Sequence, residues 1–235
     1  MNTQANRTLV FAALLASSTA LNAIPITINT VDSDWTNVVG GGTSLNFVDT
    51  DGMAGNEEIR WGSARVQSGY RFDSGAPPAF AVETGEQFTL GYFTHFNNPI
   101  FGSSIASAQL EISTSLTING TMVFEGPFAF SFSHNETPNS CRPQPSCAND
   151  IVSFANLSTS DTFEVDGQQL TLELLGFEQG GVFTDTFSTV EGQTNVAQLH
   201  AIFRMPSQAI PEPASVTLFS LGVLGMSAGI LRQHV

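Results

Sequence analysis

The sequence predicts an all-β protein, with one jelly-roll-like β-sandwich over residues 24–205 flanked by a signal peptide and an apolar C-terminal helix. The first observation is period-two alternation: Phe128, Phe130 and Phe132 alternate with small or polar residues, which places one face of a strand on a core. The second is the absence of a 3.6-residue apolar stripe between the two terminal segments. The same alternation recurs at residues 110–118, 170–174 and 197–203.

Turn dipeptides separate the alternating runs. Asn119-Gly120 joins two of them and predicts a tight β-hairpin, because Asn and Gly accept the positive φ angles that such turns require. Asp166-Gly167 is a further turn signal between alternating runs. The chain between the terminal segments has no internal repeat and no long linker, so we expect a single domain.

The N-terminal segment, residues 1–23, has the order of features found in secretory signal peptides. One basic residue, Arg7, precedes an apolar stretch at residues 9–16, and small residues follow. The apolar stretch is too short to span a bilayer. We therefore expect export, with cleavage after Ala20 or Ala23.

The C-terminal segment, residues 206–235, is organised differently. Residues 214–231 carry no charge and include three glycines, a composition typical of a short membrane span, and Arg232 follows directly. Before the span, the two prolines of Pro211-Glu212-Pro213 enforce an extended backbone. This order predicts a transmembrane helix with its basic end in the cytoplasm.

These C-terminal features together resemble the PEP-CTERM sorting signal, which is carried by Pro211, Glu212, Pro213, the glycine-containing span and Arg232. The family tail is often a run of several arginines, whereas here Arg232 precedes Gln-His-Val. The resemblance implies recognition by exosortase, a membrane-embedded cysteine transpeptidase. It also implies a Gram-negative host that makes extracellular polysaccharide.

The charge balance narrows the choice of partners. The chain has 21 acidic residues, 7 arginines and no lysine, giving a formal net charge of −14. Such a surface repels phosphate backbones, so nucleic acid is not an expected partner. The absence of lysine excludes Schiff-base chemistry, whereas the many carboxylates are able to attract divalent cations.

Two cysteines, Cys141 and Cys147, are separated by five residues. In an exported protein, a close pair of this kind predicts a disulfide bond. A structural metal site would require further ligands nearby. We expect the bond to stiffen one loop.

Two histidine motifs, Thr94-His95-Phe96-Asn97 and His134-Asn135-Glu136, are the most polar clusters near strand ends. Each follows a predicted phenylalanine-rich strand, so we expect both to lie in loops at one end of the sandwich. If the imidazoles and the carboxylate converge, they have the chemistry of a transition-metal site or an acid–base pair. The alternative, which we favour, is a structural hydrogen-bonded network.

An acidic segment supplies a candidate calcium site, with Asp49, Asp51 and Glu57 as ligands. Carboxylates beside a glycine turn suit calcium, which takes several oxygen ligands. The spacing is not that of an EF-hand, because Met53 occupies the third ligand position. An ordinary Asp-x-Asp-Gly turn is the alternative. We expect no other cofactor.

A second resemblance covers most of the domain. Residues 35–38, 58–62, 67–70, 93–100, 133–138 and 189–192 together resemble the THxN group of PEP-CTERM proteins, whose ectodomain is similar to the choice-of-anchor K domain. This resemblance implies a surface-display module with no established catalysis.

We therefore expect a non-enzymatic surface or matrix protein that passes through the inner membrane to the cell surface. There it would act as a structural or glycan- or protein-binding component of an extracellular polysaccharide layer. Its expected partners are exosortase, the export machinery, extracellular polysaccharide or surface proteins, and the membrane before processing. The alternative is a secreted hydrolase of polysaccharide, either metal-dependent or carboxylate-based, that uses His95, His134 and Glu136.

Overall fold

The computed structural model describes residues 23–63, 65–139, 149–155, 158–179 and 181–205. Within these ranges the chain is built from β-strands, and helix is limited to one 3-10 turn, η1 (Gly42–Ser44). This confirms the all-β prediction. In the same ranges, no helix has the length and apolar character needed to cross a membrane. The predicted signal peptide, apart from its last residue, and the predicted C-terminal helix lie outside the described residues.

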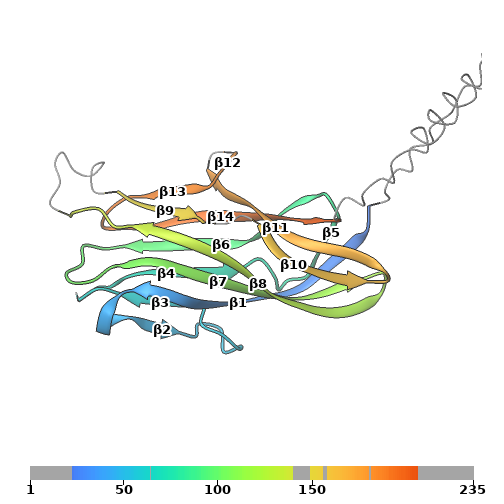
Figure 1. Ribbon diagram of the computed structural model, residues 1–235, viewed down its shortest axis with the longest axis horizontal. Coiled ribbons are helices and arrows are strands. Elements are labelled where there is room, and N and C mark those ends of the chain that lie inside the picture. The colour runs from blue at the N-terminus through green and yellow to red at the C-terminus, as the bar shows by residue number, and fades with distance from the viewer. Residues whose placement is uncertain (1–22, 64, 140–148, 156–157, 180, 206–235) are drawn as a thin grey trace, which may run out of the picture.

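The strands form two antiparallel sheets, and in Figure 1 the long strands of both sheets run along a common axis. The six-stranded sheet has, in spatial order, β13 (Thr186–Thr189), β9 (Asp150–Phe154), β8 (Thr121–Asn135), β7 (Ile105–Ile118), β1 (Pro25–Gly40) and β5 (Phe80–Glu83).

The eight-stranded sheet has the order β10 (Ser158–Val165), β11 (Gln168–Gln179), β14 (Gln193–Arg204), β6 (Gln87–Asn97), β4 (Ser68–Ser74), β3 (Glu58–Trp61) and β2 (Asn46–Val48). Its eighth strand, β12 (Val182–Thr184), pairs with β11 beside this path. Some neighbouring strands are distant in sequence. For example, β14 lies between β11 and β6.

Aromatic side chains from the two sheets meet in the core, so the fold is sandwich-like. Phe132 on β8 stacks on Phe93 on β6, with ring centroids 5.4 Å apart. Trp35 on β1 lies 5.5 Å from Tyr70 on β4 by the same measure. All four side chains are at most 1% exposed. Burial of rings of this size is the main stabilising contribution to such a core.

The predicted hairpin is present, and the predicted turn at Asp166-Gly167 closes a second hairpin. Ile118 of β7 pairs with Thr121 of β8, so Asn119 and Gly120 form a two-residue turn with φ angles of 50° and 79°. Asp166 and Gly167 form the equivalent turn between β10 and β11, with φ angles of 52° and 76°. Two consecutive positive φ angles define the turn whose twist matches that of the flanking strands.

The core changes character along the sandwich. At one end it is apolar: Phe88 of β6 stacks on Phe203 of β14 with centroids 5.3 Å apart, and Ile26 of β1 pairs with Ile118. At the other end, where β6 and β8 finish and β9 begins, buried polar groups replace the apolar side chains. These polar groups form the candidate site.

Candidate functional site

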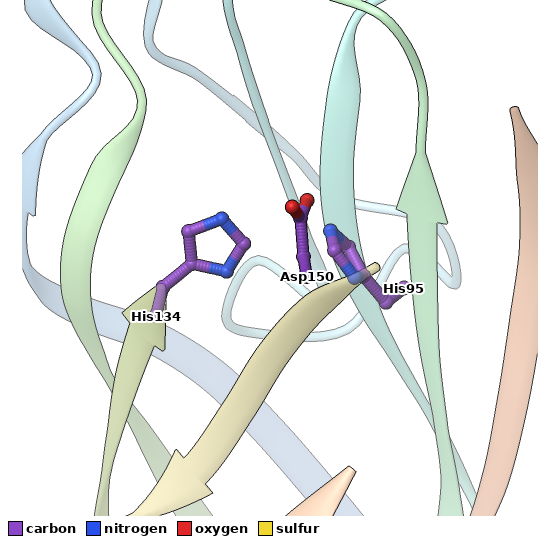
Figure 2. A group of neighbouring side chains, drawn as sticks. All are labelled: His95, His134 and Asp150. Carbon is purple, nitrogen blue, oxygen red and sulfur yellow. The ribbon is translucent and has the colours of Figure 1, made fainter. Parts of the chain in front are cut away.

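The two histidine motifs meet between the sheets, together with a carboxylate that the sequence analysis did not single out. His95 is on β6, His134 is on β8, and Asp150 is the first residue of β9. The two imidazole centroids are 5.3 Å apart and the rings are perpendicular. Figure 2 shows the Asp150 carboxylate between the two rings, and ligand atoms of the three residues lie within 4.8 Å of one another. We call this group the histidine cluster.

The prediction that both motifs lie in loops after their strands is wrong for all of their residues except Glu136, which follows β8. Strand β6 continues to Asn97 and β8 continues to Asn135, because His95 pairs with Asn195 of β14 and His134 pairs with Val152 of β9. Each imidazole takes the inward position that follows a buried phenylalanine in the alternation. The histidines are therefore core residues and not loop residues.

Alternation separates the motif residues into two groups. Thr94 precedes His95 and Asn135 follows His134, so their side chains point away from the space between the two imidazoles. Asn135 is exposed. Thr94 is buried, although it lies on the face of its sheet that points away from the cluster. Of the predicted set, His95, Asn97, His134 and Glu136 reach the cluster.

The hydrogen bonds of His95 define its protonation. Its Nδ1 lies 2.8 Å from Oγ1 of Thr189, and that hydroxyl donates to the backbone carbonyl of Asp150 at 3.3 Å. Nδ1 therefore carries the proton and donates it to Thr189. Burial, followed by the neighbouring His134, holds the pKa of His95 well below its usual value, so the ring is neutral.

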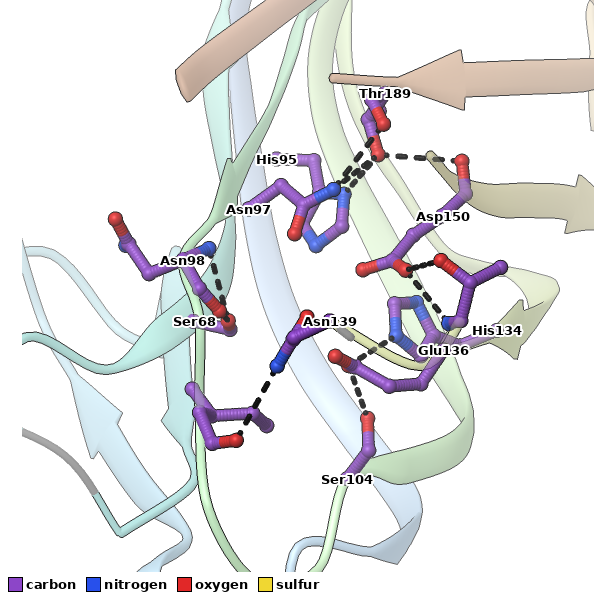
Figure 3. A network of polar contacts seen from close by, with 12 residues as sticks. Ser68, His95, Asn97, Asn98, Ser104, His134, Glu136, Asn139, Asp150 and Thr189 are labelled. Carbon is purple, nitrogen blue, oxygen red and sulfur yellow. Dashed lines mark hydrogen bonds and ion pairs between the residues drawn. The ribbon is translucent and has the colours of Figure 1, made fainter. Parts of the chain in front are cut away.

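Two buried acceptor atoms, one on His95 and one on Asn97, have no hydrogen-bond partner among the described residues. In the neutral ring Nε2 is unprotonated, and it has no hydrogen-bond partner among the described residues. The Asn97 amide donates to the Thr189 carbonyl at 3.1 Å and to its Oγ1 at 3.3 Å, while Asn97 Oδ1 has no partner in the same part of the chain. Thr189 thus orients both side chains (Figure 3). Burying an acceptor without a partner costs free energy.

His134 is held from both sides. Its Nδ1 lies 2.5 Å from the Tyr70 hydroxyl, and its Nε2 lies 3.2 Å from Oε2 of Glu136, to which Ser104 also donates at 2.9 Å. Burial, with added repulsion from Asp150 and Glu136, raises the pKa of Tyr70 well above its usual value. Tyr70 therefore keeps its proton and donates it to Nδ1, while Nε2–H donates to Glu136.

Asp150 is fully buried, and only one of its two carboxylate oxygens has hydrogen-bond partners among the described residues. Its Oδ1 accepts from the backbone N–H of Thr137 at 2.8 Å and from the Thr137 hydroxyl at 3.2 Å. Its Oδ2 has no hydrogen-bond partner among the described residues. Burial is the main cause that raises the pKa of Asp150 to about 6, against the opposing Thr137 hydrogen bond.

Glu191, in the turn between β13 and β14, adds a third carboxylate. Oxygen atoms of Glu136, Asp150 and Glu191 lie within 4.8 Å of one another, so Asp150 belongs both to this group and to the histidine cluster. Burial and repulsion from the other two carboxylates raise the pKa of Glu191 to about 7. Negative charge is therefore concentrated at this end of the sandwich.

Aromatic rings enclose the histidine cluster. Trp61 stacks on His95 with centroids 6.0 Å apart and meets His134 edge-on at 5.4 Å. Tyr70 lies 5.1 Å from His95 by the same measure. Trp61, Tyr70 and His95 are 0% exposed. The imidazoles thus lie in a low-dielectric environment with no open surface.

Tyr70, Asp150, Thr189 and Glu191 of this site were not identified from the sequence. Tyr70, Thr189 and Glu191 belong to segments that carry the second resemblance, but nothing in their local pattern identified them as neighbours of the histidines. Asp150 opens a five-residue strand, which is too short to give a clear alternation. The inward register of His95 and His134 was readable, because each follows a buried phenylalanine at a spacing of two.

The predicted calcium ligands are partly assembled. Asp51 and Glu57 have oxygens within 4.8 Å of each other and of Asp32 on β1. Asp49 instead accepts the backbone N–H groups of Asp51 at 3.1 Å and Gly52 at 2.6 Å, as expected of an Asx turn. We call Asp32, Asp51 and Glu57 the acidic turn group. Burial raises the pKa of Asp32, and repulsion from Asp51 and Glu57 raises it further. A hydrogen bond from the Ser33 backbone acts in the opposite direction.

The remaining predicted residues lie outside the described part of the chain. These are the cysteines of the predicted disulfide, Cys141 and Cys147, and the sorting residues Pro211, Glu212, Pro213 and Arg232. In the comparisons with known proteins, no family model matches the chain and no curated protein matches it.

Proposed function

We propose that this chain is an exported surface or extracellular-matrix protein whose β-sandwich is a non-catalytic structural or binding module. The arrangement of its two terminal segments supports export and sorting. The all-β domain between them supports display, since such a domain presents two broad sheet faces to partners.

The observation that carries the non-catalytic role is the enclosure of the histidines. His95 is 0% exposed, and the side chain of His134 is also 0% exposed behind the rings of Trp61 and Tyr70. A polysaccharide hydrolase must place its acid and its base or nucleophile on either side of an accessible glycosidic bond. These imidazoles have no such access, which favours the structural role over the hydrolase that the sequence also allowed.

The finer parts of the proposal rest on the resemblance to PEP-CTERM proteins of the THxN group. They comprise a jelly-roll-like sandwich, removal of the signal peptide, transient insertion of the C-terminal helix in the inner membrane, and processing by exosortase. The processed protein would then reside at the surface or in the polysaccharide layer of a Gram-negative bacterium, in contact with polysaccharide or surface proteins.

Export and sorting are tested by expressing the full chain in a Gram-negative host with and without exosortase. Mass spectrometry of the extracellular protein should find neither residues 9–16 nor residues 218–232 when exosortase is present. The matched variant Glu212→Ala should accumulate in the inner membrane with an intact C-terminus. Extracellular protein with both termini intact in the exosortase-containing host would contradict the proposal.

A further inference from the structure

The charges at the polar end of the sandwich are not balanced by the basic residues that the structure describes. Among them, Arg60, Arg71 and Arg204 form ion pairs with Glu58, Asp73 and Glu173, all away from the histidine cluster. Three carboxylates, those of Glu136, Asp150 and Glu191, therefore converge with no guanidinium paired to them in the described ranges. A buried carboxylate ordinarily requires a cation or a proton.

We propose that His95, His134 and Asp150 bind one divalent transition-metal ion between the two sheets, with Glu136 and Glu191 as the carboxylates beside it. The proposal goes beyond the structural or binding role of the sandwich and does not depend on it. It rests on the geometry of the cluster, whose ligand atoms lie within 4.8 Å of one another, and on buried atoms that have no other partner (Figures 2 and 3).

Two buried ligand atoms of the cluster are free to bind an ion. His95 Nε2 and Asp150 Oδ2 belong to fully buried side chains, and neither has a hydrogen-bond partner among the described residues. The hydrogen bonds on the opposite atoms, from Nδ1 to Thr189 and from Thr137 to Oδ1, direct the free atoms into the cluster. Metal-ligating histidines are oriented in this way, with the second ring nitrogen donating to a protein acceptor.

His134 has the same arrangement available. When Nε2 serves as ligand, the neutral ring carries its proton on Nδ1, and Nδ1–H donates to the Tyr70 oxygen that is already 2.5 Å away. The contact that the metal replaces is the longer one, 3.2 Å from Nε2 to Glu136. Glu136, with its unpartnered Oε1, is then free to turn toward the ion.

The ligand types select the metal. Two imidazoles with one carboxylate suit zinc or iron(II), whereas calcium and magnesium take oxygen ligands. Two carboxylates beside the cluster reach solvent, since the Glu136 side chain is 20% exposed and Glu191 is half-buried. The ion would link β6 of one sheet to β8 and β9 of the other.

The test is a zinc titration of the full-length chain, purified in mild detergent after treatment with chelator and followed by calorimetry. The wild type should bind one zinc per chain. His95→Gln and Asp150→Asn should each bind at least about 100-fold more weakly, because each loses a direct ligand. His200→Gln is the matched control. His200 is on β14 and contacts Glu178 of β11, so this substitution should leave the zinc affinity unchanged.

Two outcomes overturn the proposal. Equal zinc affinity in wild type, His95→Gln and Asp150→Asn would place the ion elsewhere. Calcium binding that excludes zinc, lost in Glu191→Gln and retained in His95→Gln, would define an oxygen-only site. Should His95→Gln fail to fold, cobalt(II) absorption provides the test. The wild type should show the visible bands of a nitrogen-ligated ion, and Asp150→Asn should lose them. Absence of these bands from the wild type would overturn the proposal.

Discussion

The histidine cluster and the acidic turn group are both sets of three potential ligands, but they are built in different ways. The histidine cluster draws its members from β6, β8 and β9 on facing sheets. The acidic turn group takes Asp51 and Glu57 from one short segment and adds Asp32 from β1. Long-range strand pairing creates the first group, whereas turn geometry creates most of the second.

The two groups also differ in how many of their ligand atoms form hydrogen bonds with the rest of the chain. In the acidic turn group, Asp51 accepts the backbone N–H of Met53 and Oε2 of Glu57 accepts from Thr50 at 2.6 Å, while Oε1 of the buried Glu57 has no partner among the described residues. In the histidine cluster, His95 Nε2 and Asp150 Oδ2 have no partner among the described residues, whereas both ring nitrogens of His134 do. A turn thus uses most of its ligand atoms in its own hydrogen bonds and leaves one buried oxygen free, whereas the buried convergence leaves a free ligand atom on two of its three members.

The largest expected difference between the two regions is in stability. His95→Ala should lower the free energy of unfolding by about 1–3 kcal/mol in the presence of chelator, because the buried Thr189 hydroxyl loses its hydrogen-bond partner. Asp49→Ala, in the exposed turn, should cost less than about 1 kcal/mol. Urea unfolding of the full chain measures both, and equal costs would remove the distinction between the regions.

Removing one hydroxyl tests the His134 side of the cluster. Tyr70→Phe should cost about 1 kcal/mol, because Nδ1 of the buried His134 loses its hydrogen bond. Tyr92→Phe is the control, since Tyr92 is 43% exposed. The same urea unfolding experiment compares them. A Tyr70→Phe protein as stable as the Tyr92→Phe protein would show that this hydrogen bond is not important for folding.

The crowded carboxylates should make stability depend on pH. Because the pKa of Glu191 is raised from 4.5 to about 7, the folded protein binds its proton more tightly than the unfolded chain. The stabilisation from this group is complete below pH 4.5 and is lost as the pH rises toward 7. Glu191→Gln should therefore gain stability relative to wild type between pH 5 and pH 8 in metal-free buffer.

Thermal unfolding across that pH range, with chelator present, provides the measurement. Glu164→Gln is the control, because Glu164 is exposed on β10. A Glu191→Gln curve parallel to that of wild type would show that the three carboxylates do not repel one another in the folded protein.

The smallest expected effect belongs to the acidic turn group. Calcium should stabilise wild type weakly, by about 0.4 kcal/mol when its concentration equals the dissociation constant. Asp51→Asn should abolish this shift, whereas Asp185→Asn, at an exposed position, should keep it. Thermal unfolding with and without calcium compares the three proteins, and an unchanged shift in Asp51→Asn would exclude this group as the calcium site.

The parts of the fold that were predictable from the sequence are those specified by local pattern. The alternation of Phe128, Phe130 and Phe132 correctly indicated an inward strand face, and Asn119-Gly120 correctly indicated the hairpin between β7 and β8. These features depend only on neighbouring residues, since side-chain direction repeats every two residues and a tight turn needs particular φ angles.

The composition of the histidine cluster was not predictable in the same way. His95 and Thr189 are 94 residues apart, and His134 and Tyr70 are 64 apart. Their contacts depend on which strands are neighbours and which sheets face each other, and alternation alone does not specify either. The strand ends were misplaced for a related reason: pairing with β14 and β9 extends β6 and β8 through the polar residues.

The most direct test of the metal site is a crystal structure of the full-length chain loaded with zinc, with anomalous scattering recorded at the zinc absorption edge. We expect an anomalous peak between the two sheets, about 2.0–2.2 Å from His95 Nε2 and from an Asp150 oxygen, with His134 as a further ligand. Anomalous peaks confined to surface histidines or carboxylates, with His95 Nε2 free of metal, would contradict it.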